Sequence, residues 1–237
     1  MTTEVVKLYG SWFCPFVQRA WIALLEKGVT FEYVEIDPYD KTEEFLSMNP
    51  RGLVPAITHK GKSVYESTVC IEYVDEAWPN DPALLPADPF ERAQTRIWSD
   101  FVNKKIVPVY YSILQNQDIG KQEEGKVSLM RHLETITKAM STEGPYFCGN
   151  HFGMVDIMLF PFALRVLWVL GHFREFVVPA EGVFERFHKW NEACDTRSSV
   201  VSTLANKENL IAKYERYANN SAKTEVADAI RRGEVLP

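Results

Sequence analysis

One segment near the start of the chain, Trp12–Arg19, constrains the fold more than any other. A β-like run, Val5–Tyr9, precedes it. Apolar residues with the spacing of one helical face follow it: Val17, Ala20, Trp21 and Leu24. Pro15 suits the first helical position, and Gly28 suits the position just after the helix ends. The pattern therefore predicts a strand, a tight turn and a helix, with Cys14 at the turn.

Cys14 would stand where the unpaired backbone N–H groups and the positive end of the helix dipole converge. Such a position lowers the pKa of a thiol from about 8.5 into the range of about 3.5–7.5, which gives a thiolate at neutral pH. The alternative is that Cys14 is a small buried apolar residue, as most unpaired cysteines are. The strand before it and the proline after it favour the reactive thiolate.

Composition excludes several classes of function. The chain has 237 residues, of which 46% are hydrophobic and 24% are charged, and a net charge of −6. Without a block of basic residues, the chain is not expected to bind nucleic acid. The four cysteines lie far apart, and neither they nor the five histidines show metal-ligand spacing, so we predict no bound metal. We also expect no secretory leader and a reducing, cytoplasmic setting.

The first third of the chain alternates strand and helix patterns. Thr30–Ile36 reads as a second strand, so the segment up to it forms a βαβ unit with parallel strands. After a short helical patch, Leu53–His59 and Ser63–Glu66 form a predicted hairpin, in which Pro55 must lie at an edge or bend. Ser67 then fits the N-cap of the next helix. The predicted order is βαβ followed by ββα.

Beyond this unit the pattern is helical. Four prolines lie in Trp78–Pro89, which marks a linker, so we predict domains at residues 1–79 and 90–237 joined by residues 80–89. Residues 90–117 read as a long helix that Pro108 must kink or break. Met154–Leu170 is the most apolar stretch, and it is predicted to be a buried core helix rather than a membrane span.

A resemblance to a known family becomes specific at these motifs. Cys14-Pro15-Phe16 after the first strand, the Asn49–Pro55 segment with its Val-Pro, and Tyr65-Glu66-Ser67 resemble the cytosolic glutathione transferases, and the omega class among them. The resemblance implies a thioredoxin-like N-terminal domain, an all-α C-terminal domain and a homodimer. Gly153 takes the place of the Ser or Thr that usually begins the family's capping motif, with Asp156 as its third residue, and we interpret Asp156 as a folding residue.

The resemblance also implies roles for individual residues. Cys14 would be the nucleophile that forms a mixed disulfide with glutathione. The residues implied to bind glutathione are Phe16, Lys41, Leu53, Val54, Pro55, Glu66 and Ser67. Lys41 would reach the glycyl carboxylate, the Val54 backbone would pair with the cysteinyl backbone, and Pro55 would be cis. Glu66 and Ser67 would hold the γ-glutamyl end. Lys41 and Glu66 can equally be surface charges, and Ser67 only a helix cap.

The implied activity is glutathione-dependent thiol transfer and reduction, including reduction of dehydroascorbate and removal of glutathione from S-glutathionylated compounds. Val17 occupies the position of a second cysteine, so an external thiol must resolve the mixed disulfide. The partners would be glutathione and small electrophilic or disulfide substrates. Aromatic candidates for the wall of the second-substrate site are Phe13, Tyr110, Phe162 and Trp168, and Arg165 can face that site or the core.

Two alternatives remain open on the same motifs. Gln18-Arg19 is also found in the chloride intracellular channel proteins, which share Cys-Pro-Phe-x-Gln-Arg, and in the plant lambda class. A non-catalytic interaction protein on this fold is the other alternative. Glu66-Ser67 argues against the channel proteins, which typically lack this pair. Cys14, Lys41, Val54, Glu66 and Ser67 together argue against the non-catalytic protein. The first strand begins near Val5, without the N-terminal extension that is usual in the omega class.

Overall fold

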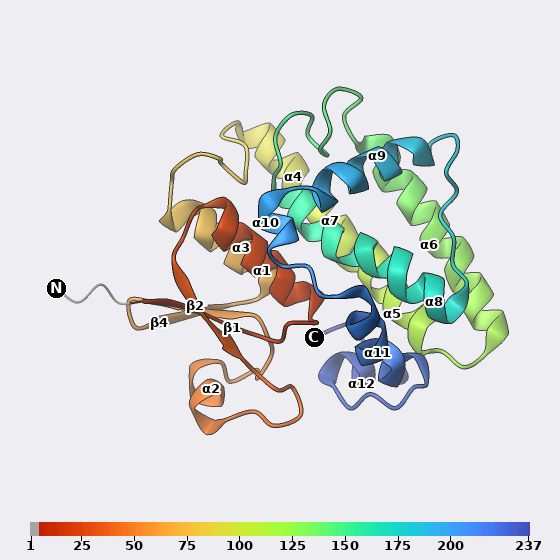
Figure 1. Cartoon of the computed structure of the whole chain (residues 1–237), viewed down its shortest axis with the longest axis horizontal. Coiled ribbons are helices and arrows are strands. Elements are labelled where there is room, and N and C mark those ends of the chain that lie inside the picture. Colours follow the sequence, from red (N-terminus) through yellow and green to blue (C-terminus); the bar gives the residue numbers. More distant parts are fainter. Residues whose placement is uncertain (1–4) are drawn as a thin grey trace. The chain divides into compact units, whose positions relative to one another are not determined.

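A computed structural model describes residues 5–237, and the chain divides into two compact units. The first unit contains the residues up to Arg92 together with Ser198–Leu204 (Figure 1). The second contains Ala93–Arg197 and Ala205–Pro237. The first unit thus includes the proline-rich stretch that the sequence suggests is a linker, and a short segment from late in the chain.

The first unit is built on a four-stranded sheet in the order β2-β1-β3-β4. The strands are β1 Val6–Gly10, β2 Phe31–Glu35, β3 Ala56–His59 and β4 Lys62–Tyr65. β1 and β2 are parallel, whereas β1 with β3 and β3 with β4 are antiparallel. The predicted βαβ–ββα order is therefore confirmed.

Three helices cover this sheet on its two faces. Figure 1 shows α1 (Pro15–Glu26) and α3 (Ser67–Ala77) above it and α2 (Glu43–Met48) below it. Tyr9, Phe45 and Ala56 belong to one apolar cluster on the α2 face, against which Val34 also packs. On the other face Gly10 lets α1 approach closely, because a Cβ there would lie 2.3 Å from Cγ1 of Val17.

A buried ion pair holds the proline-rich stretch against the first unit. The Lys27 ammonium, near the end of α1, lies 3.0 Å from Oδ1 of Asp75 in α3, and both side chains are over nine-tenths buried. Lys27 also donates to the carbonyl of Pro82 at 3.0 Å. The Asp75 carboxylate accepts from the backbone N–H groups of Leu84 and Leu85. These contacts fix the path of the chain after α3.

The late segment of the first unit packs on α1, the helix that follows Cys14. It contains the short helix α10 (Ser198–Val201). Gln18 donates from Nε2 to the Thr203 hydroxyl at 3.1 Å, and the Ser199 hydroxyl donates to the Glu26 carboxylate. Both contacts lie on α1, so residues far away in the sequence help to hold that helix.

The second unit is helical, as predicted. Its helices are α4 Pro89–Phe101, which starts in the first unit, α5 Val107–Gln115, α6 Ile119–Ala139, α7 Met154–Arg165, α8 Gly171–Arg174, α9 Phe184–Asp195, α11 Lys207–Ala218 and α12 Glu225–Arg232. Two π-helical turns, η1 Val102–Ile106 and η2 Val166–Leu170, join α4 to α5 and α7 to α8.

The helix that was expected to kink or break at Pro108 does not end there, and a π-helical turn precedes the proline. Pro108 lies in the first turn of α5, immediately after η1. Proline has no N–H to donate, and its ring conflicts with the carbonyl four residues earlier in a regular α-helix. The wider π-turn before it changes the hydrogen-bond spacing there and accommodates the proline without ending the helix.

The most apolar helical stretch, Met154–Arg174, is a core element of the second unit. It is the one helix within residues 5–237 that is long and apolar enough to span a membrane by composition, yet 83% of its most apolar window is buried. Asp156 accepts from the backbone N–H of Gly153 at 2.9 Å, of Phe147 at 2.8 Å, and from the Trp190 indole at 2.7 Å. Asp156 is therefore the folding residue that the capping motif predicts.

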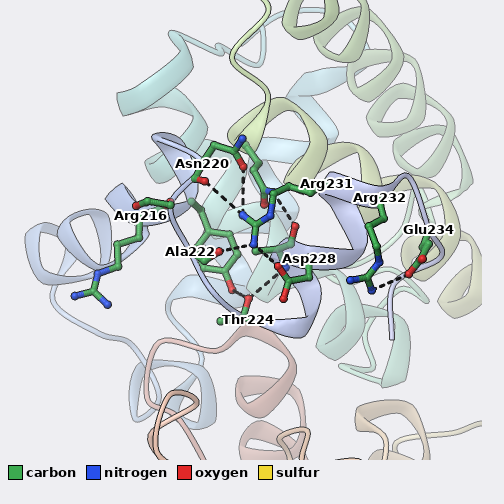
Figure 2. Close-up of polar contacts among 12 residues, drawn as sticks. Arg216, Asn220, Ala222, Thr224, Asp228, Arg231, Arg232 and Glu234 are labelled. Atoms are coloured by element: carbon green, nitrogen blue, oxygen red, sulfur yellow. Dashed lines mark hydrogen bonds and ion pairs between the residues drawn. The ribbon is translucent and has the colours of Figure 1, made fainter.

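The polar C-terminal tail, about which the sequence gives no prediction, forms α12 and is held by hydrogen bonds. Figure 2 shows Arg231 reaching back to Asn220, Ala222 and Asp228. The Thr224 hydroxyl caps the start of α12 by accepting from the Ala227 backbone N–H at 3.2 Å. α12 is thus an ordered part of the second unit.

Candidate functional site

The predicted site residues lie at one end of the strands of the sheet. β1 ends at Gly10, just before the turn that contains Cys14, and Tyr9 is paired with Ala56 at the start of β3. Ala56 is paired in turn with Tyr65 at the end of β4. β3 is antiparallel to both β1 and β4. The turn after β1, the segment before β3 and the segment after β4 therefore lie at the same end of the sheet.

Cys14 is the N-cap residue of α1. Its backbone is extended, its side chain is half-buried, and Pro15 follows in the first helical turn. The Cys14 backbone N–H donates to the carbonyl of Ser11 at 2.9 Å, and its carbonyl accepts from Gln18 at 3.1 Å. The thiol therefore lies at the positive end of the helix, as expected from the sequence.

The segment before β3 has the geometry that the resemblance implies. The Val54–Pro55 peptide bond is cis. Asn49 holds the preceding turn by donating from Nδ2 to the carbonyl of Leu53 at 2.6 Å. Leu53 and Val54 are half-buried and precede the strand, which begins only at Ala56. The predicted strand start at Leu53 was wrong: the strand starts after Pro55, which has no N–H to donate to the ladder.

Lys41 lies against this same segment. Its Nζ and Cδ are each 3.5 Å from the position that a Cβ on Gly52 would occupy, and its side chain is half-buried. Gly52 has a φ of +63°, a conformation that favours glycine. A larger residue at Gly52 would therefore be strained and would crowd the lysine. The lysine is next to the turn, although its contact with a glycyl carboxylate stays a prediction.

Glu66 and Ser67 begin α3, but their capping roles differ from the prediction. Glu66 is the N-cap residue, with φ +72° and ψ +117°, and Ser67 is the first helical residue. Ser67 was wrongly predicted as the cap, because the chain reverses direction one residue earlier. An unfavourable φ at a non-glycine residue is typical of functional sites. The backbone N–H of Ser67 is one of those at the start of the helix, where an anion is favoured.

Two arginines that were not predicted as site residues contact this pair. The guanidinium of Arg51 lies 2.5 Å from Oε1 of Glu66. Arg19, fully buried in α1, donates to the Ser67 hydroxyl at 3.2 Å and lies 5.3 Å from the Phe16 ring centroid. Because arginine only donates, the Ser67 oxygen accepts this bond and its own proton points elsewhere. No spacing in the sequence indicates these contacts, since they join separate elements.

Of the aromatic wall candidates, three are core residues. Tyr110 and Phe162 are fully buried in the second unit, and Phe13 is buried in the first. Trp168 is half-buried beneath the Lys207 ammonium. Arg165 is also buried, where it donates from Nε to the Tyr214 hydroxyl at 2.8 Å. Arg165 thus faces the core of the second unit.

Metal ligands are not grouped in the part of the chain that the structure describes. Residues 5–237 contain no cluster of three or more His, Cys, Asp or Glu side chains arranged to hold an ion. The chemistry that the site offers is that of a thiol, two arginines, a lysine and a carboxylate. This donor set suits a small peptide with charges at both ends.

Two family models match the chain. The model for the glutathione S-transferase N-terminal domain matches residues 8–82, and that for the C-terminal domain matches residues 121–193. A relative, glutathione S-transferase U26 from Arabidopsis thaliana, is 33% identical over 89% of this chain and 94% of its own length. The sequence relatives are mostly of the Tau class.

Solved structures of both classes resemble the fold. Glutathione transferase Omega 3C from Trametes versicolor superposes with a TM-score of 0.79 and 41% identity, covering 86% of this chain and 90% of that one. Rice GST1, solved in complex with glutathione, superposes with a TM-score of 0.81 and 29% identity, covering 91% and 96%. The omega class is therefore not confirmed. Both comparisons agree on the family, and the chain belongs to the glutathione S-transferases.

Proposed function

We propose that this chain is a glutathione-dependent thiol transferase and reductase that works through a mixed disulfide between Cys14 and glutathione. The observation that carries the proposal is the position of Cys14 as N-cap of α1, with Pro15 following it. This geometry favours the thiolate, which is the nucleophilic form of cysteine. A hydroxyl at this position would instead leave the glutathione sulfur as the nucleophile.

The first half-reaction forms the mixed disulfide. The Cys14 thiolate attacks the glutathione sulfur of an S-glutathionylated substrate, the new S–S bond forms, and the substrate leaves as a thiolate that takes a proton. Glutathione thiolate then attacks the glutathione sulfur of the mixed disulfide, which yields oxidised glutathione and restores the Cys14 thiolate. Val17, one helical turn on, is no thiol and cannot resolve the disulfide internally. With dehydroascorbate, the Cys14 thiolate would add to a carbonyl carbon, and glutathione thiolate would attack the Cys14 sulfur of this adduct. The C–S electron pair would leave with ascorbate, the mixed disulfide would form, and a second glutathione would release oxidised glutathione as above.

Glutathione binding is assigned to the residues around this thiol. The Ser67 hydroxyl and backbone N–H would take the γ-glutamyl carboxylate, and the Glu66 carboxylate its ammonium group. Lys41 would take the glycyl carboxylate, and the Val54 backbone would pair with the cysteinyl backbone as an added strand. Phe16 would pack beside the peptide, with Leu53 and Pro55 shaping the segment.

The test compares the pKa of the Cys14 thiol with activity. We would follow the pH dependence of alkylation, peptide by peptide, together with glutathione-dependent disulfide reduction in wild type, Cys14→Ser and Cys148→Ser. Cys148 is the matched control, because it is an exposed thiol outside the site. A Cys14 pKa well below 8 and reduction lost only in Cys14→Ser would support the proposal. An ordinary pKa without reductase activity would refute it.

Conjugation of electrophiles to glutathione is the second candidate function. It is favoured by the Tau-class relatives among the glutathione S-transferases. Activity of the wild type with a chromogenic electrophile such as 1-chloro-2,4-dinitrobenzene, greater than its disulfide reduction, would favour this candidate.

We propose that the protein acts in the cytoplasm as a homodimer. A shallow groove on the first unit, along α3 beside Val64, supports the homodimer. Its apolar residue Val69 is 51% exposed, and Glu72 and Glu76 also line it. A second copy would cover this apolar surface. Light scattering after chromatography tests the proposal, because Val69→Glu should convert a dimer to a monomer. A wild type that is monomeric at micromolar concentration would refute it.

A further inference from the structure

A tyrosine on the edge strand β2 faces the helix that carries Cys14. Tyr33 is paired with Leu8, and Glu35 with Gly10, across the parallel β1–β2 ladder. Successive strand residues point to opposite faces of a sheet, and paired residues point to the same face. Val34 packs in the cluster on the α2 face, so Tyr33 and Glu35 lie on the α1 face.

Contacts with α1 and with the turn before it fix the position of the Tyr33 side chain. Its ring packs against Trp21 at a tilt of 32°, with centroids 4.6 Å apart. Trp21 follows Cys14 by seven residues, which is two helical turns along the same face. Two residues further along β2, Oε1 of Glu35 accepts a hydrogen bond from the backbone N–H of Trp12 at 3.3 Å. Trp12 lies two residues before Cys14. Tyr33 therefore lies between the second turn of α1 and the turn that contains the thiol.

The Tyr33 hydroxyl is buried, and no acceptor meets it at full hydrogen-bond geometry within residues 5–237. Its oxygen is shielded from solvent. Leaving a buried hydroxyl unsatisfied is costly, and such groups call for an explanation. Burial raises the pKa of Tyr33 far above its ordinary value. The Glu35 carboxylate, which lies close enough to attract the hydroxyl proton, and Cys14 raise this pKa further. The phenol therefore holds its proton more tightly than an exposed tyrosine does.

We propose that Tyr33 is a further catalytic residue for the reaction of Cys14: its hydroxyl donates a hydrogen bond to the sulfur when that sulfur carries negative charge. The inference rests on the proposed thiol chemistry. When glutathione thiolate attacks the mixed disulfide, the bond between the two sulfurs breaks and its electron pair returns to Cys14. A neutral donor that is already in place stabilises this leaving thiolate without reorganisation.

Other charged side chains belong to the elements around this end of α1. They are Glu35 on β2, Arg19 within α1, and Glu66 with Arg51 at the start of α3. Glu35 opposes thiolate formation by charge repulsion, while its acceptor oxygen is engaged by Trp12. The uncharged Tyr33 differs from all of these because it can donate to the thiolate without changing the net charge. Its contribution can therefore be isolated with a substitution that removes only the hydroxyl.

Tyr33→Phe is that substitution, because it keeps the ring that packs against Trp21. We expect the pKa of the Cys14 thiol, measured by thiolate absorbance and by peptide-resolved alkylation, to rise by about one unit, a tenfold loss of thiolate below the pKa. The kcat for disulfide reduction should fall about tenfold with little change in the KM for glutathione. Tyr73→Phe is the matched control. Tyr73 lies on α3, and the substitution removes a hydroxyl that is hydrogen-bonded to Nδ1 of His59 at 2.7 Å. It should leave the thiol pKa unchanged.

The outcomes separate this inference from the proposed function. If wild-type Cys14 has a low pKa and reductase activity, and Tyr33→Phe changes neither, the role of Tyr33 is refuted while the proposed function stands. If wild-type Cys14 has an ordinary pKa and no reductase activity, the proposed function fails and this inference fails with it. Should Tyr33→Phe fold poorly, Glu35→Gln gives a second measurement. Removing the competing carboxylate should lower the thiol pKa, and a pKa that rises would contradict the inference.

Discussion

Replacing Asp75 with asparagine should destabilise the first unit far more than a surface substitution would. The Asp75 carboxylate lies 3.0 Å from the Lys27 ammonium and accepts two backbone N–H groups from the segment after α3, at 2.8 and 3.2 Å. The Lys27 side chain is only 1% exposed. Asp75→Asn keeps the size but removes the charge, so the buried ammonium keeps carbonyl partners but no counter-ion. Breaking a buried pair in this way costs about 3–5 kcal/mol.

A double-mutant cycle checks the origin of this loss. Lys27→Met removes the buried ammonium and its bond to the Pro82 carbonyl. In Asp75→Asn/Lys27→Met no unpaired charge remains, so we expect the double variant to be more stable than the sum of the single losses by about 1–3 kcal/mol. Urea unfolding followed by tryptophan fluorescence measures each free energy of unfolding. A loss below 1 kcal/mol in Asp75→Asn, or strictly additive losses, would refute the argument.

Three further outcomes follow from single positions. Glu66→Gly should raise the free energy of unfolding by about 1 kcal/mol, because glycine accepts the φ of +72° without strain. The same variant should raise the KM for glutathione at least tenfold. Glu66→Gln should raise this KM without stabilising the protein. Gly10→Ala should cost about 1–3 kcal/mol, because its Cβ would lie 2.3 Å from Val17, and Val17→Ala should restore part of that loss in urea unfolding. Burial raises the pKa of Asp156 to about 6, above the unfolded value of about 3.9, so its stabilising contribution is present below pH 4 and is lost as pH rises through 6. Unfolding measured from pH 4 to 7 should show this fall in wild type and a flatter profile in Asp156→Asn.

Local chemistry explains which parts of the fold could be predicted. The strand, turn and helix around Cys14 follow from hydrophobic spacing, from Pro15 and from Gly28, whose φ of +61° matches its predicted place after the helix. Asp156 also follows from its place in a short motif. These features depend on neighbours within a few residues, which a sequence shows directly. The cis Val54–Pro55 bond was expected only through the family resemblance.

Features that depend on contacts between distant residues could not be predicted. Arg51 pairs with Glu66 across fifteen positions, and Arg19 with Ser67 across forty-eight. The periodicity of an apolar stretch shows that a residue lies on the apolar face of a helix, but not whether that face packs in the core or lines a substrate site. Tyr110 therefore appeared among the wall candidates although it is fully buried.

Under the proposed mechanism, the residue at position 14 decides which of two reactions this fold performs. Sequence relatives of the Tau class and structural neighbours of the Omega class are both similar to this chain, so both reactions have to be measured. Cys14→Ser keeps the position at the start of α1 but replaces a group that ionises readily with one that does not. A serine hydroxyl cannot form the mixed disulfide, yet it can donate a hydrogen bond to the glutathione thiolate. If Glu66 and Ser67 hold glutathione as proposed, Cys14→Ser should lose disulfide reduction and gain conjugation of electrophiles, with the KM for glutathione changed less than threefold. Loss of both activities together with glutathione binding, in a folded variant, would show that Cys14 belongs to the binding site itself rather than setting the type of reaction.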